Sequence, residues 1–222
     1  MTGRHIDFVQ TLSASTKRDY VQRVVQYDKA ECAAIAKRWG EEYWDGDRRY
    51  GYGGYRYDGR WRGVADEIAR HYGLRPGQRV LDVGCGKGYL LYELTQAVPG
   101  IEVRGIDASA YGIAHAKDEV KPFLTVGSAT DLPYEDGEFD LVVSLATLHN
   151  LKIYELFAAL GEVQRVGRGG KYVMVESWRT EREKANLLYW QLTCESFHSV
   201  DAWEWIFAQA GYDGDYGFIY FE

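Results

Sequence analysis

The chain of 222 residues contains little cysteine: only Cys32, Cys85 and Cys194. Three widely spaced cysteines without a C-x-x-C pair argue against a disulfide framework and against a structural zinc site. Asp, Asn and His likewise form no group with the spacing of metal ligands, so we predict no metal. We expect a reducing, cytoplasmic setting.

A long apolar run and an excess of basic residues are also lacking. No run is long enough to span a bilayer, and the N-terminal residues contain no apolar signal-peptide core, so we expect no membrane partner. Lys and Arg number 26 against 33 Asp and Glu, which gives a net charge of −7. A long basic face for nucleic acid is therefore not expected.

What the chain does contain is enough apolar material for a core. Hydrophobic residues make up 46% and aromatic residues 15% of it, which is typical of a globular chain and not of a disordered one. This length suits one domain. We predict a single globular unit in which residues 1–60 form an N-terminal helix and an aromatic cap, and residues 61–222 form the main domain.

The most informative stretch is R-V-L-D-V-G-C-G-K-G-Y, residues 79–89. Its apolar beginning predicts a short buried strand, and the helical spacing of the apolar residues that follow it predicts a helix. Between them, Gly84, Gly86 and Gly88 let the backbone turn tightly and approach a ligand closely. A strand, a glycine turn and a helix N-terminus together form a cradle for a cofactor.

The spacing of these glycines distinguishes between cofactors. The dinucleotide fingerprint G-x-G-x-x-G has its third glycine where this chain has Tyr89. The stretch resembles instead the first motif of the class I S-adenosylmethionine-dependent methyltransferases of the small-molecule type: a hydrophobic strand and an acidic residue, followed by G-x-G-x-G. The resemblance implies that the cofactor is S-adenosyl-L-methionine. It assigns these residues to cofactor binding: Asp82, Gly84, Cys85, Gly86 and Gly88.

A second predicted strand, residues 101–107, ends in Asp107, a little over twenty residues beyond the glycine turn. An acid at about this offset accepts hydrogen bonds from ribose hydroxyls in dinucleotide folds, and the resemblance carries Asp107 to the same role. The alternative is an N-cap for a helix that starts near Ser109. We place the next residue, Ala108, in the same pocket.

A third predicted strand, residues 122–126, is followed by G-S-A-T-D-L-P. Methyltransferases of this kind often carry Gly-Asp-Ala here, and their Asp bonds the adenine amino group. Ser128 stands in place of that Asp, so we expect adenine binding to rest on Ser128 and on the backbone around Ala129. The run from Leu132 to Asp140 resembles the family's L-P-(aromatic)…G-x-(aromatic)-D pattern.

Two strand ends supply candidates for the chemistry. A fourth strand, residues 139–145, ends at Leu145, which should face the cofactor, and continues into A-T-L-H-N. We predict that His149 removes a proton from the acceptor, because imidazole titrates near neutral pH; the alternative is a histidine that only packs beside the cofactor. Glu176, at the end of a fifth strand over residues 172–175, is the second candidate base.

Residues 41–61 alternate aromatic residues with Gly, Asp and Arg, a pattern that a regular amphipathic helix cannot have. They suit an ordered loop, which is either a strap that closes over the core or a lid over the cofactor and the substrate. As a lid, its rings would stack on a substrate, and its arginines would hold a carboxylate or a phosphate. A helical insertion at residues 180–200 is expected to overhang the same site. The predicted substrate-binding residues are Tyr43, Tyr52, Tyr55, Tyr57, Arg56, Arg60 and Tyr189.

The order of these elements predicts a Rossmann-like α/β fold, doubly wound, with a mainly parallel sheet and helices on both faces. We expect residues 1–15 to form a loose leader without regular secondary structure. One helix is predicted to follow, from Ser15 or Thr16 to about residue 39. Asp201 is expected to cap the last helix. The tail, residues 212–222, has room for one strand, so we predict either an abbreviated sheet edge or pairing with a second subunit in a homodimer.

We predict methyl transfer from S-adenosylmethionine to an oxygen or nitrogen atom of a small-molecule acceptor: a sugar, an aromatic or an amino-acid-like metabolite. Three alternatives stay open. The first is a non-catalytic scaffold that binds S-adenosylmethionine. The second is an NAD-dependent oxidoreductase, against which Tyr89 speaks. The third is a nucleic-acid methyltransferase, against which the negative charge and the missing [Asp/Asn/Ser]-Pro-Pro-(aromatic) signature weigh.

Overall fold

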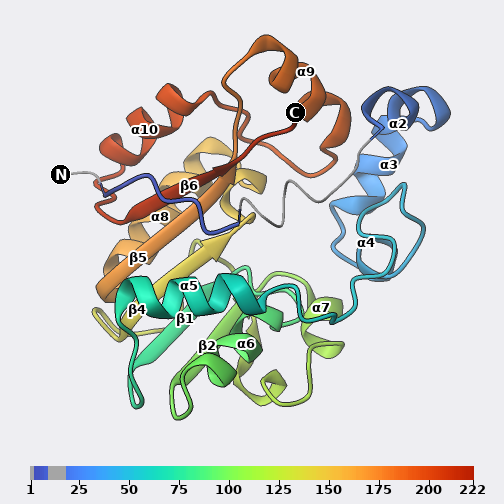
Figure 1. Cartoon of the computed structure of the whole chain (residues 1–222). Helices are drawn as coiled ribbons and strands as arrows, with labels where there is room; N and C mark the ends of the chain where they lie inside the picture. Colours follow the sequence, from blue (N-terminus) through green and yellow to red (C-terminus); the bar gives the residue numbers. More distant parts are fainter. Residues whose placement is uncertain (1–2, 10–18) are drawn as a thin grey trace.

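A parallel β-sheet forms the centre of the molecule in the computed structural model, which describes residues 3–9 and 19–222 (Figure 1). Each strand of this sheet pairs in parallel with its neighbours. The spatial order of the strands is β3 (Leu124–Val126), β2 (Glu102–Asp107), β1 (Arg79–Val83), β4 (Phe139–Leu145), β5 (Gly167–Glu176) and β6 (Asp215–Ile219). The predicted Rossmann-like, doubly wound fold is confirmed.

Helices cover both faces of the sheet (Figure 1), because successive residues of a strand point to opposite sides. The first face carries α5 (Arg62–Tyr72) and α6 (Tyr89–Ala97), and the second carries α8 (Ile153–Val166) and α10 (Val200–Gln209). On β1, Val80 belongs to the core cluster of the first face and Leu81 to that of the second. The core is therefore split into two layers by the sheet.

The direction of winding reverses between β1 and β4. From β1 the chain proceeds outward through β2 and β3, and it then returns to β4, β5 and β6 on the other side of β1. In open α/β sheets, ligands bind outside the carboxyl ends of the strands at such a switch point. Asp107, Leu145 and Glu176 end β2, β4 and β5, and they therefore lie along the edge where a site is expected.

The first described residues lie along the outer side of β6 (Figure 1). The Ile6 N–H donates to the Tyr216 carbonyl at 2.8 Å, and the Tyr216 N–H donates to the Arg4 carbonyl at 3.0 Å. Phe8 is only 6% exposed and belongs to the core of the first face. The prediction of a loose leader is therefore wrong for residues 3–9, which complete both the sheet edge and the core.

The tail forms the one strand that the sequence predicts. This strand, β6, pairs with β5 of the same chain from Tyr172–Asp215 to Glu176–Ile219. Its other side is covered by the N-terminal segment, as described above. Among the described residues the sheet therefore ends in one strand, as the prediction of an abbreviated edge has it, and residues of the same chain contact the outer side of that strand.

The single helix predicted up to about residue 39 is interrupted in the part that the structure describes. It consists of α2 (Tyr20–Gln26) and α3 (Lys29–Ala36). Tyr27 is extended, with φ −134° and ψ 148°, and the Asp28 side chain accepts two backbone N–H groups of α3 at 2.8 and 3.1 Å. The break arises because this carboxylate competes for the helical backbone. The predicted cap at Ser15 or Thr16 lies outside the described residues.

The remaining elements are short. They are α4 (Glu41–Trp44), α7 (Ala110–Ala114), η1 (Lys121–Phe123), η2 (Leu148–Asn150) and α9 (Glu181–Trp190). The helix predicted at residues 180–200 is thus helical only as far as Trp190. Ser199, and not the predicted Asp201, is the N-cap residue of α10; Asp201 lies in the first turn and accepts the Ser199 hydroxyl. Within the described residues, no helix has the length and apolar character to cross a membrane.

Replacing Phe8 by alanine tests whether the N-terminal segment is part of the core. The Phe8 ring contacts the Tyr172 ring, with 4.8 Å between centroids. Loss of a buried phenylalanine ring typically lowers the free energy of unfolding by about 3–5 kcal/mol, which urea denaturation would measure. The control is Phe123→Ala, at a side chain that is 42% exposed; its effect should be below about 1 kcal/mol. Equal stability of the two variants would contradict this assignment.

Candidate active site

The glycine turn and Asp107 lie against each other at the carboxyl ends of β1 and β2. The Gly86 N–H donates to Asp107 Oδ2 at 2.8 Å, and the Ser109 N–H donates to Oδ1 at 2.7 Å. The turn has left-handed φ angles of 85° at Gly84, 53° at Gly86 and 72° at Gly88, which other residues rarely adopt. The turn therefore requires glycine, and the carboxylate holds it in place.

Asp107 does not cap a helix, as one reading of the sequence proposed. The N-cap of α7 is Ser109, whose hydroxyl accepts the Gly112 N–H at 2.8 Å. Burial raises the pKa of Asp107, and the two backbone N–H groups that it accepts oppose this change. Each carboxylate oxygen accepts one N–H and retains capacity for another donor. Asp107 can therefore hold the turn and bind a hydroxyl at the same time.

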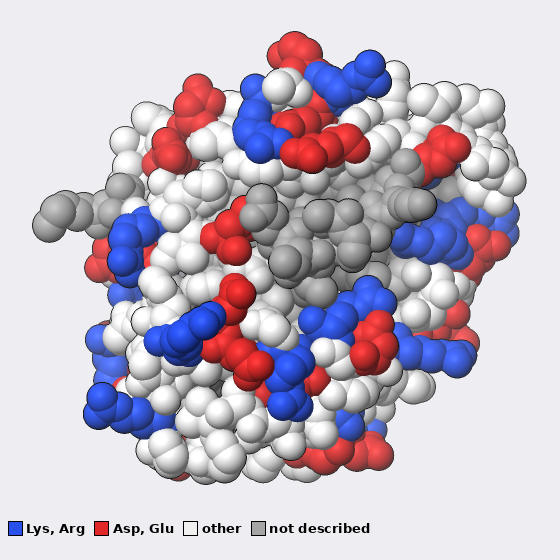
Figure 2. Space-filling view, in the orientation of Figure 1, with Lys and Arg blue, Asp and Glu red and all other residues white. Residues whose placement is uncertain are grey.

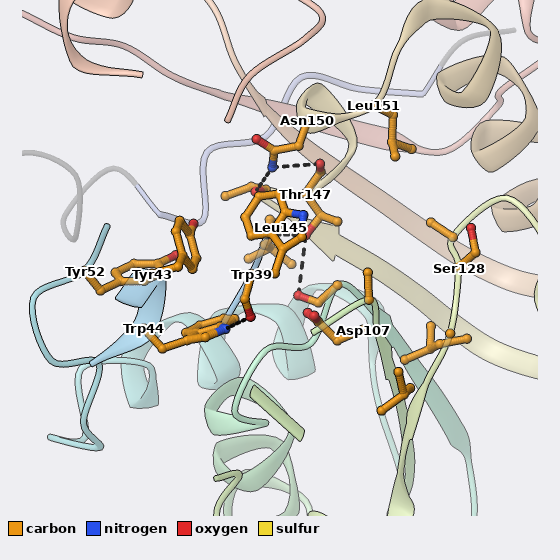
Figure 3. Close-up of a pocket in the computed structure, with 17 residues that line it drawn as sticks. Trp39, Tyr43, Trp44, Tyr52, Asp107, Ser128, Leu145, Thr147, Asn150 and Leu151 are labelled. Carbon is orange, nitrogen blue, oxygen red and sulfur yellow. Dashed lines mark hydrogen bonds between the residues drawn. The ribbon is translucent and has the colours of Figure 1, made fainter. Parts of the chain in front are cut away.

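A cavity of about 360 Å³ opens beside Asp107; we call it the first cavity (Figure 3). Figure 3 shows Trp39, Tyr43, Trp44 and Tyr52 on one side of it and Ser128 on the other. The full set of lining residues is Trp39, Tyr43, Trp44, Tyr52, Gly84, Ile106, Asp107, Ala108, Val126, Gly127, Ser128, Ala129, Leu145, Ala146, Thr147, Asn150 and Leu151. Segments from the N-terminal region and from the ends of four strands, β1 to β4, therefore meet at one place.

The aromatic side of the first cavity is anchored to the glycine turn. Trp44 Nε1 donates to Ser109 Oγ at 2.8 Å and to the Trp39 carbonyl at 3.2 Å. The Trp44 ring lies so close to Gly86 that a Cβ there would be 2.8 Å from it. The Trp44 and Tyr52 rings stack at 5.4 Å between centroids. The N-terminal region therefore packs directly on the outside of the turn and forms a fixed wall.

Backbone strain is concentrated on this cavity. Among the described residues, only two that are not glycine have positive φ: Trp39 at 53° and Ala146 at 56°. Both line the first cavity. Left-handed backbone costs a residue with a side chain about 1–2 kcal/mol, and such strain is commonly found at functional sites. The surrounding contacts must therefore hold both residues in place.

A second cavity, of about 310 Å³, adjoins the first. Tyr43, Tyr52 and Ala146 line both cavities. The second cavity lies between the N-terminal region, the end of β5 and the residues that follow α9. Its lining residues are Arg23, Tyr43, Arg48, Gly51, Tyr52, Gly54, Tyr55, Arg56, Arg60, Ala146, Glu176, Trp190, Gln191, Leu192, Thr193, Ile219 and Phe221. The two cavities therefore form neighbouring compartments with a common wall.

Glu176 supplies the carboxylate that lines the second cavity. Gln191 Nε2 donates to Glu176 Oε1. His149 Nε2 lies 3.4 Å from Glu176 Oε2, and His149 Nδ1 accepts the Glu176 backbone N–H at 3.3 Å. Because Nδ1 is an acceptor, the proton of the neutral ring is on Nε2 and faces the carboxylate. The Gln191 amide therefore holds one oxygen of Glu176, and the neutral imidazole packs beside the other.

His149 stands behind Glu176 and lines neither cavity. Its side chain is 2% exposed, and burial lowers its pKa to about 3. The ring is therefore neutral at neutral pH. Its role as the base stays a prediction, but in this arrangement a proton from the second cavity would reach Glu176 first.

Most of the predicted cofactor-binding residues meet at the first cavity. Those that line it are Gly84, Asp107, Ala108, Ser128, Ala129 and Leu145, and those that do not are Asp82, Cys85, Gly86 and Gly88. The Cys85 side chain is buried against β2, where a Cβ on Gly105 would lie 2.7 Å from its sulfur. Gly86 and Gly88 belong to the turn, and Asp82 and Cys85 are buried.

The predicted substrate-binding residues divide in a similar way. Tyr43 and Tyr52 line both cavities, Tyr55, Arg56 and Arg60 line the second, and Tyr57 and Tyr189 line neither. Tyr57 lies over α6, where its hydroxyl donates to Glu93 Oε1 at 2.6 Å. Tyr189 is an exposed residue of α9. Five of the seven residues therefore surround the second cavity, as a lid would.

Sequence reasoning missed several lining residues. In the first cavity they are Trp39, Trp44, Thr147, Asn150 and Leu151, and in the second Arg23. Thr147 and Asn150 follow the carboxyl end of β4, so their position along the chain was a usable signal. Arg23 reaches the site from α2, far away in the sequence, and no local pattern marks it.

Comparison with known proteins identifies the family. A family model described as a methyltransferase domain matches residues 74–211, which is more than half of the chain. The chain belongs to this family. It is a class I S-adenosylmethionine-dependent methyltransferase, as the glycine turn predicts.

Individual relatives agree with this assignment. An uncharacterized methyltransferase of Synechocystis sp. is 35% identical over 143 residues, which cover 62% of this chain and 65% of the relative. A demethylmenaquinone methyltransferase of Bacillus cytotoxicus is 36% identical over 119 residues, which cover 50% of this chain and 49% of the relative. The chain thus matches about half to two thirds of the length of these curated relatives.

The solved structure of YcgJ protein from Bacillus subtilis has the same fold. Its TM-score to this methyltransferase is 0.55 at 22% sequence identity, and the alignment covers 69% of this chain and 68% of that chain.

The cofactor of this methyltransferase is S-adenosylmethionine, and the first cavity fits it. Asp107 can accept ribose hydroxyls while it holds Gly86. At the other side of the cavity, Ser128 would lie near the adenine, although its hydroxyl already accepts the Thr130 N–H at 3.1 Å. Adenine recognition would therefore rest on the backbone and on the shape of the cavity around Ala129, and not on a charged acceptor.

Replacing Asp107 by asparagine tests its role in cofactor binding. The amide loses the charge-assisted hydrogen bonds that a carboxylate forms with ribose hydroxyls and with the Gly86 N–H. We expect S-adenosylmethionine to bind about tenfold to hundredfold more weakly in calorimetry. The control is Asp131→Asn, at an exposed residue that does not line the cavity. Unchanged affinity in Asp107→Asn would refute the ribose role.

Replacing Asp82 by asparagine tests the buried acid of the motif. Asp82 is 4% exposed, and burial, followed by the nearby Asp107, raises its pKa from 3.8 to about 8. Between about pH 4 and pH 8 the unfolded chain loses the Asp82 proton, whereas the folded protein keeps it. The free energy of unfolding of the wild type therefore falls as the pH rises through this range. The variant lacks this dependence. Urea titrations between pH 5 and 8 give the unfolding free energies of both proteins. The difference, variant minus wild type, should increase by up to about 1.4 kcal/mol per pH unit. A constant difference would show that Asp82 does not titrate there.

Proposed function

We propose that this methyltransferase transfers the methyl group to an oxygen or nitrogen atom of a small-molecule acceptor held in the second cavity. The observation that carries the proposal is the wall that both cavities share, formed by Tyr43, Tyr52 and Ala146. An acceptor in the second cavity would meet the methyl group at this wall. The surrounding rings would align the two reactants and exclude water.

The size and surroundings of the second cavity support a small acceptor. At about 310 Å³, it is at the lower end of the range for small-molecule sites. On the molecular face in Figure 2, Lys and Arg are interspersed with Asp and Glu, which is unlike the basic stripe that nucleic acid would need. The relative from Bacillus cytotoxicus is also named for a small molecule, demethylmenaquinone.

For methyl transfer, the main task of the protein is to position the acceptor against the methyl group. S-adenosylmethionine supplies an electrophilic methyl carbon on a sulfonium. A lone pair of the acceptor forms the new bond to this carbon while the carbon–sulfur bond breaks, and that electron pair stays on sulfur. An oxygen or nitrogen acceptor must also lose a proton. In our proposal the Glu176 carboxylate receives it, and His149 and Gln191 hold that carboxylate toward the cavity.

Acceptor screening tests the proposal. The purified protein is incubated with S-adenosylmethionine and a panel of sugars, phenols and amino acids, and methylated products are identified by mass spectrometry. We expect at least one small molecule to be methylated on oxygen or nitrogen. Methylation of a nucleic acid or a protein, with no turnover of small molecules, would contradict the proposal. Tight cofactor binding without turnover of any acceptor would favour a scaffold.

Replacing Glu176 by glutamine tests the proton acceptor. Loss of a general base typically lowers kcat about 10²–10⁴-fold. Because Glu176 lines only the second cavity, the Kd for S-adenosylmethionine should stay within about twofold of the wild type. Steady-state kinetics and calorimetry give the two values. Glu181→Gln, at an exposed carboxylate of α9, is the matched control.

His149→Ala separates the two candidate bases. If the ring only orients Glu176, this variant should lose less in kcat than Glu176→Gln does. The reverse order would restore His149 as the base. Equal turnover of the wild type and both variants would remove both residues from the mechanism.

A further inference from the structure

The second cavity has an unusual balance of charge. Its walls include four arginines, Arg23, Arg48, Arg56 and Arg60, and one carboxylate, that of Glu176. Arg23 comes from α2, and the other three come from the loop between α4 and α5. Segments far apart in the sequence thus bring an excess of positive charge to one small space.

Two of these arginines share one aromatic surface. The guanidinium carbon of Arg23 lies 4.5 Å from the ring centroid of Trp190, and that of Arg48 lies 5.1 Å from it. Trp190 ends α9, which packs against α2 (Figure 1). Stacking on an aromatic face holds a guanidinium in place while its N–H groups remain able to donate. The pair therefore forms a preorganised double cation.

The two guanidinium groups disfavour each other's charge. Burial, followed by the nearby Arg48 guanidinium, lowers the pKa of Arg23. The Nε of Arg23 is buried and has no hydrogen-bond partner among the described residues. A buried donor without an acceptor is unfavourable, and two adjacent like charges repel each other. An oxyanion in the cavity would supply an acceptor and offset the repulsion.

The other two arginines lie on the exposed loop. Arg60 is paired with Asp58, with 2.5 Å between Arg60 Nη2 and Asp58 Oδ2. For Arg56, no carboxylate partner occurs within 4.0 Å in residues 3–9 and 19–222. Arg56 therefore provides a charge at the second cavity that the described residues do not neutralise.

Beside polar groups such as Gln191 and Thr193, the rest of the cavity wall includes an apolar surface. It contains the rings of Tyr52, Tyr55 and Phe221 and the side chains of Leu192 and Ile219. Arginines beside such a surface favour a ligand that has an apolar body and an anionic group. Gln191 donates to the Glu176 carboxylate, so the proposal assigns the proton to this carboxylate and the anion to the arginines.

We propose that the second cavity selects acceptors that carry an oxyanion, a carboxylate or a phosphate, on an apolar body, and that Arg23 and Arg48 on Trp190 form the principal anion contact. This inference rests on the proposed function, because it names the class of acceptor for that site. In this proposal Arg48 determines substrate specificity, Asp107 binds the cofactor and Glu176 accepts the proton.

Binding of simple probes tests this inference without turnover. Phenyl phosphate and benzoate supply the two oxyanions on one apolar body, and benzamide is the neutral match. Calorimetry without cofactor should show at least one of the two anions binding at least tenfold more tightly than benzamide. The preference should weaken as NaCl is raised. Equal Kd values for the three probes would overturn the inference, and the ranking of the two anions would identify the preferred oxyanion.

Variants connect the preference to the arginines. Arg48→Gln should weaken binding of the preferred anion by about tenfold to hundredfold, whereas Arg48→Lys, which keeps the charge but not the planar fork, should lose less. Arg70→Gln, at an exposed residue of α5, is the control and should bind as the wild type does. Arg56→Gln, on the exposed loop, gives a second measurement if Arg48→Gln does not fold. Unchanged binding in the folded variants would overturn the inference.

Turnover separates this inference from the proposed function. If anions bind through Arg48 but no small acceptor is methylated, the proposed function fails, and the anion preference of the cavity stands. If acceptors are methylated, and neutral ones react as well as anionic ones in both the wild type and Arg48→Gln, this inference fails, and the proposed function stands. In either case, the Kd for S-adenosylmethionine should be the same in Arg48→Gln and the wild type.

Discussion

The hydrogen bond from the Gly86 N–H to the Asp107 carboxylate, at 2.8 Å, is the contact on which the site depends. It joins the turn after β1 to the end of β2, the two places that must face the same nucleoside. The left-handed glycines make the turn possible, and the carboxylate gives it one position. The negative charge that holds the protein together here is also the group best suited to a ribose. If Asp107 binds the ribose as we predict, local stability and cofactor recognition use the same side chain.

A second constraint comes from the N-terminal region. Trp44 packs on the turn and donates to Ser109, so the aromatic wall is attached to the same two strand ends as the cofactor. The loop that follows carries three of the four arginines of the second cavity. In the function that we propose, the sheet therefore provides the nucleoside site, while the N-terminal region forms much of the compartment for the acceptor. The family's general chemistry and the particular specificity of this chain lie on different parts of the sequence.

The sequence predicts the central fold well, because its signals are local. Buried parallel strands read as short apolar runs, and the glycine turn and Asp107 stand at fixed offsets from them. The first described residues could not be placed in this way, since Ile6 pairs with Tyr216 at the opposite end of the chain. Several residues of the aromatic stretch at 41–61 line the two cavities. By contrast, Arg23 and Trp190 meet only through the packing of α2 on α9.

His149 shows the same limit within the site. Its position after β4 is visible in the sequence, but its burial is not. The His149 carbonyl accepts the N–H groups of Glu195 and Ser196 at 3.0 and 2.9 Å, and the ring packs behind Glu176. These contacts depend on the non-helical stretch after α9, where the sequence suggests a continuing helix. The local pattern identifies the right edge of the sheet, and the tertiary contacts decide which side chain reaches the cavity.

The wall formed by Tyr43 and Tyr52 has a thermodynamic consequence. Both side chains belong to two cavities. If a ligand in one cavity orders these side chains, less entropy remains to be lost when a ligand enters the other. The two ligands then raise each other's affinity by the same factor, as linkage requires. After methyl transfer both ligands are different molecules. The coupling between the affinities of the two substrates therefore does not apply to the two products. Cooperative loading and easier product departure would thus have one structural origin.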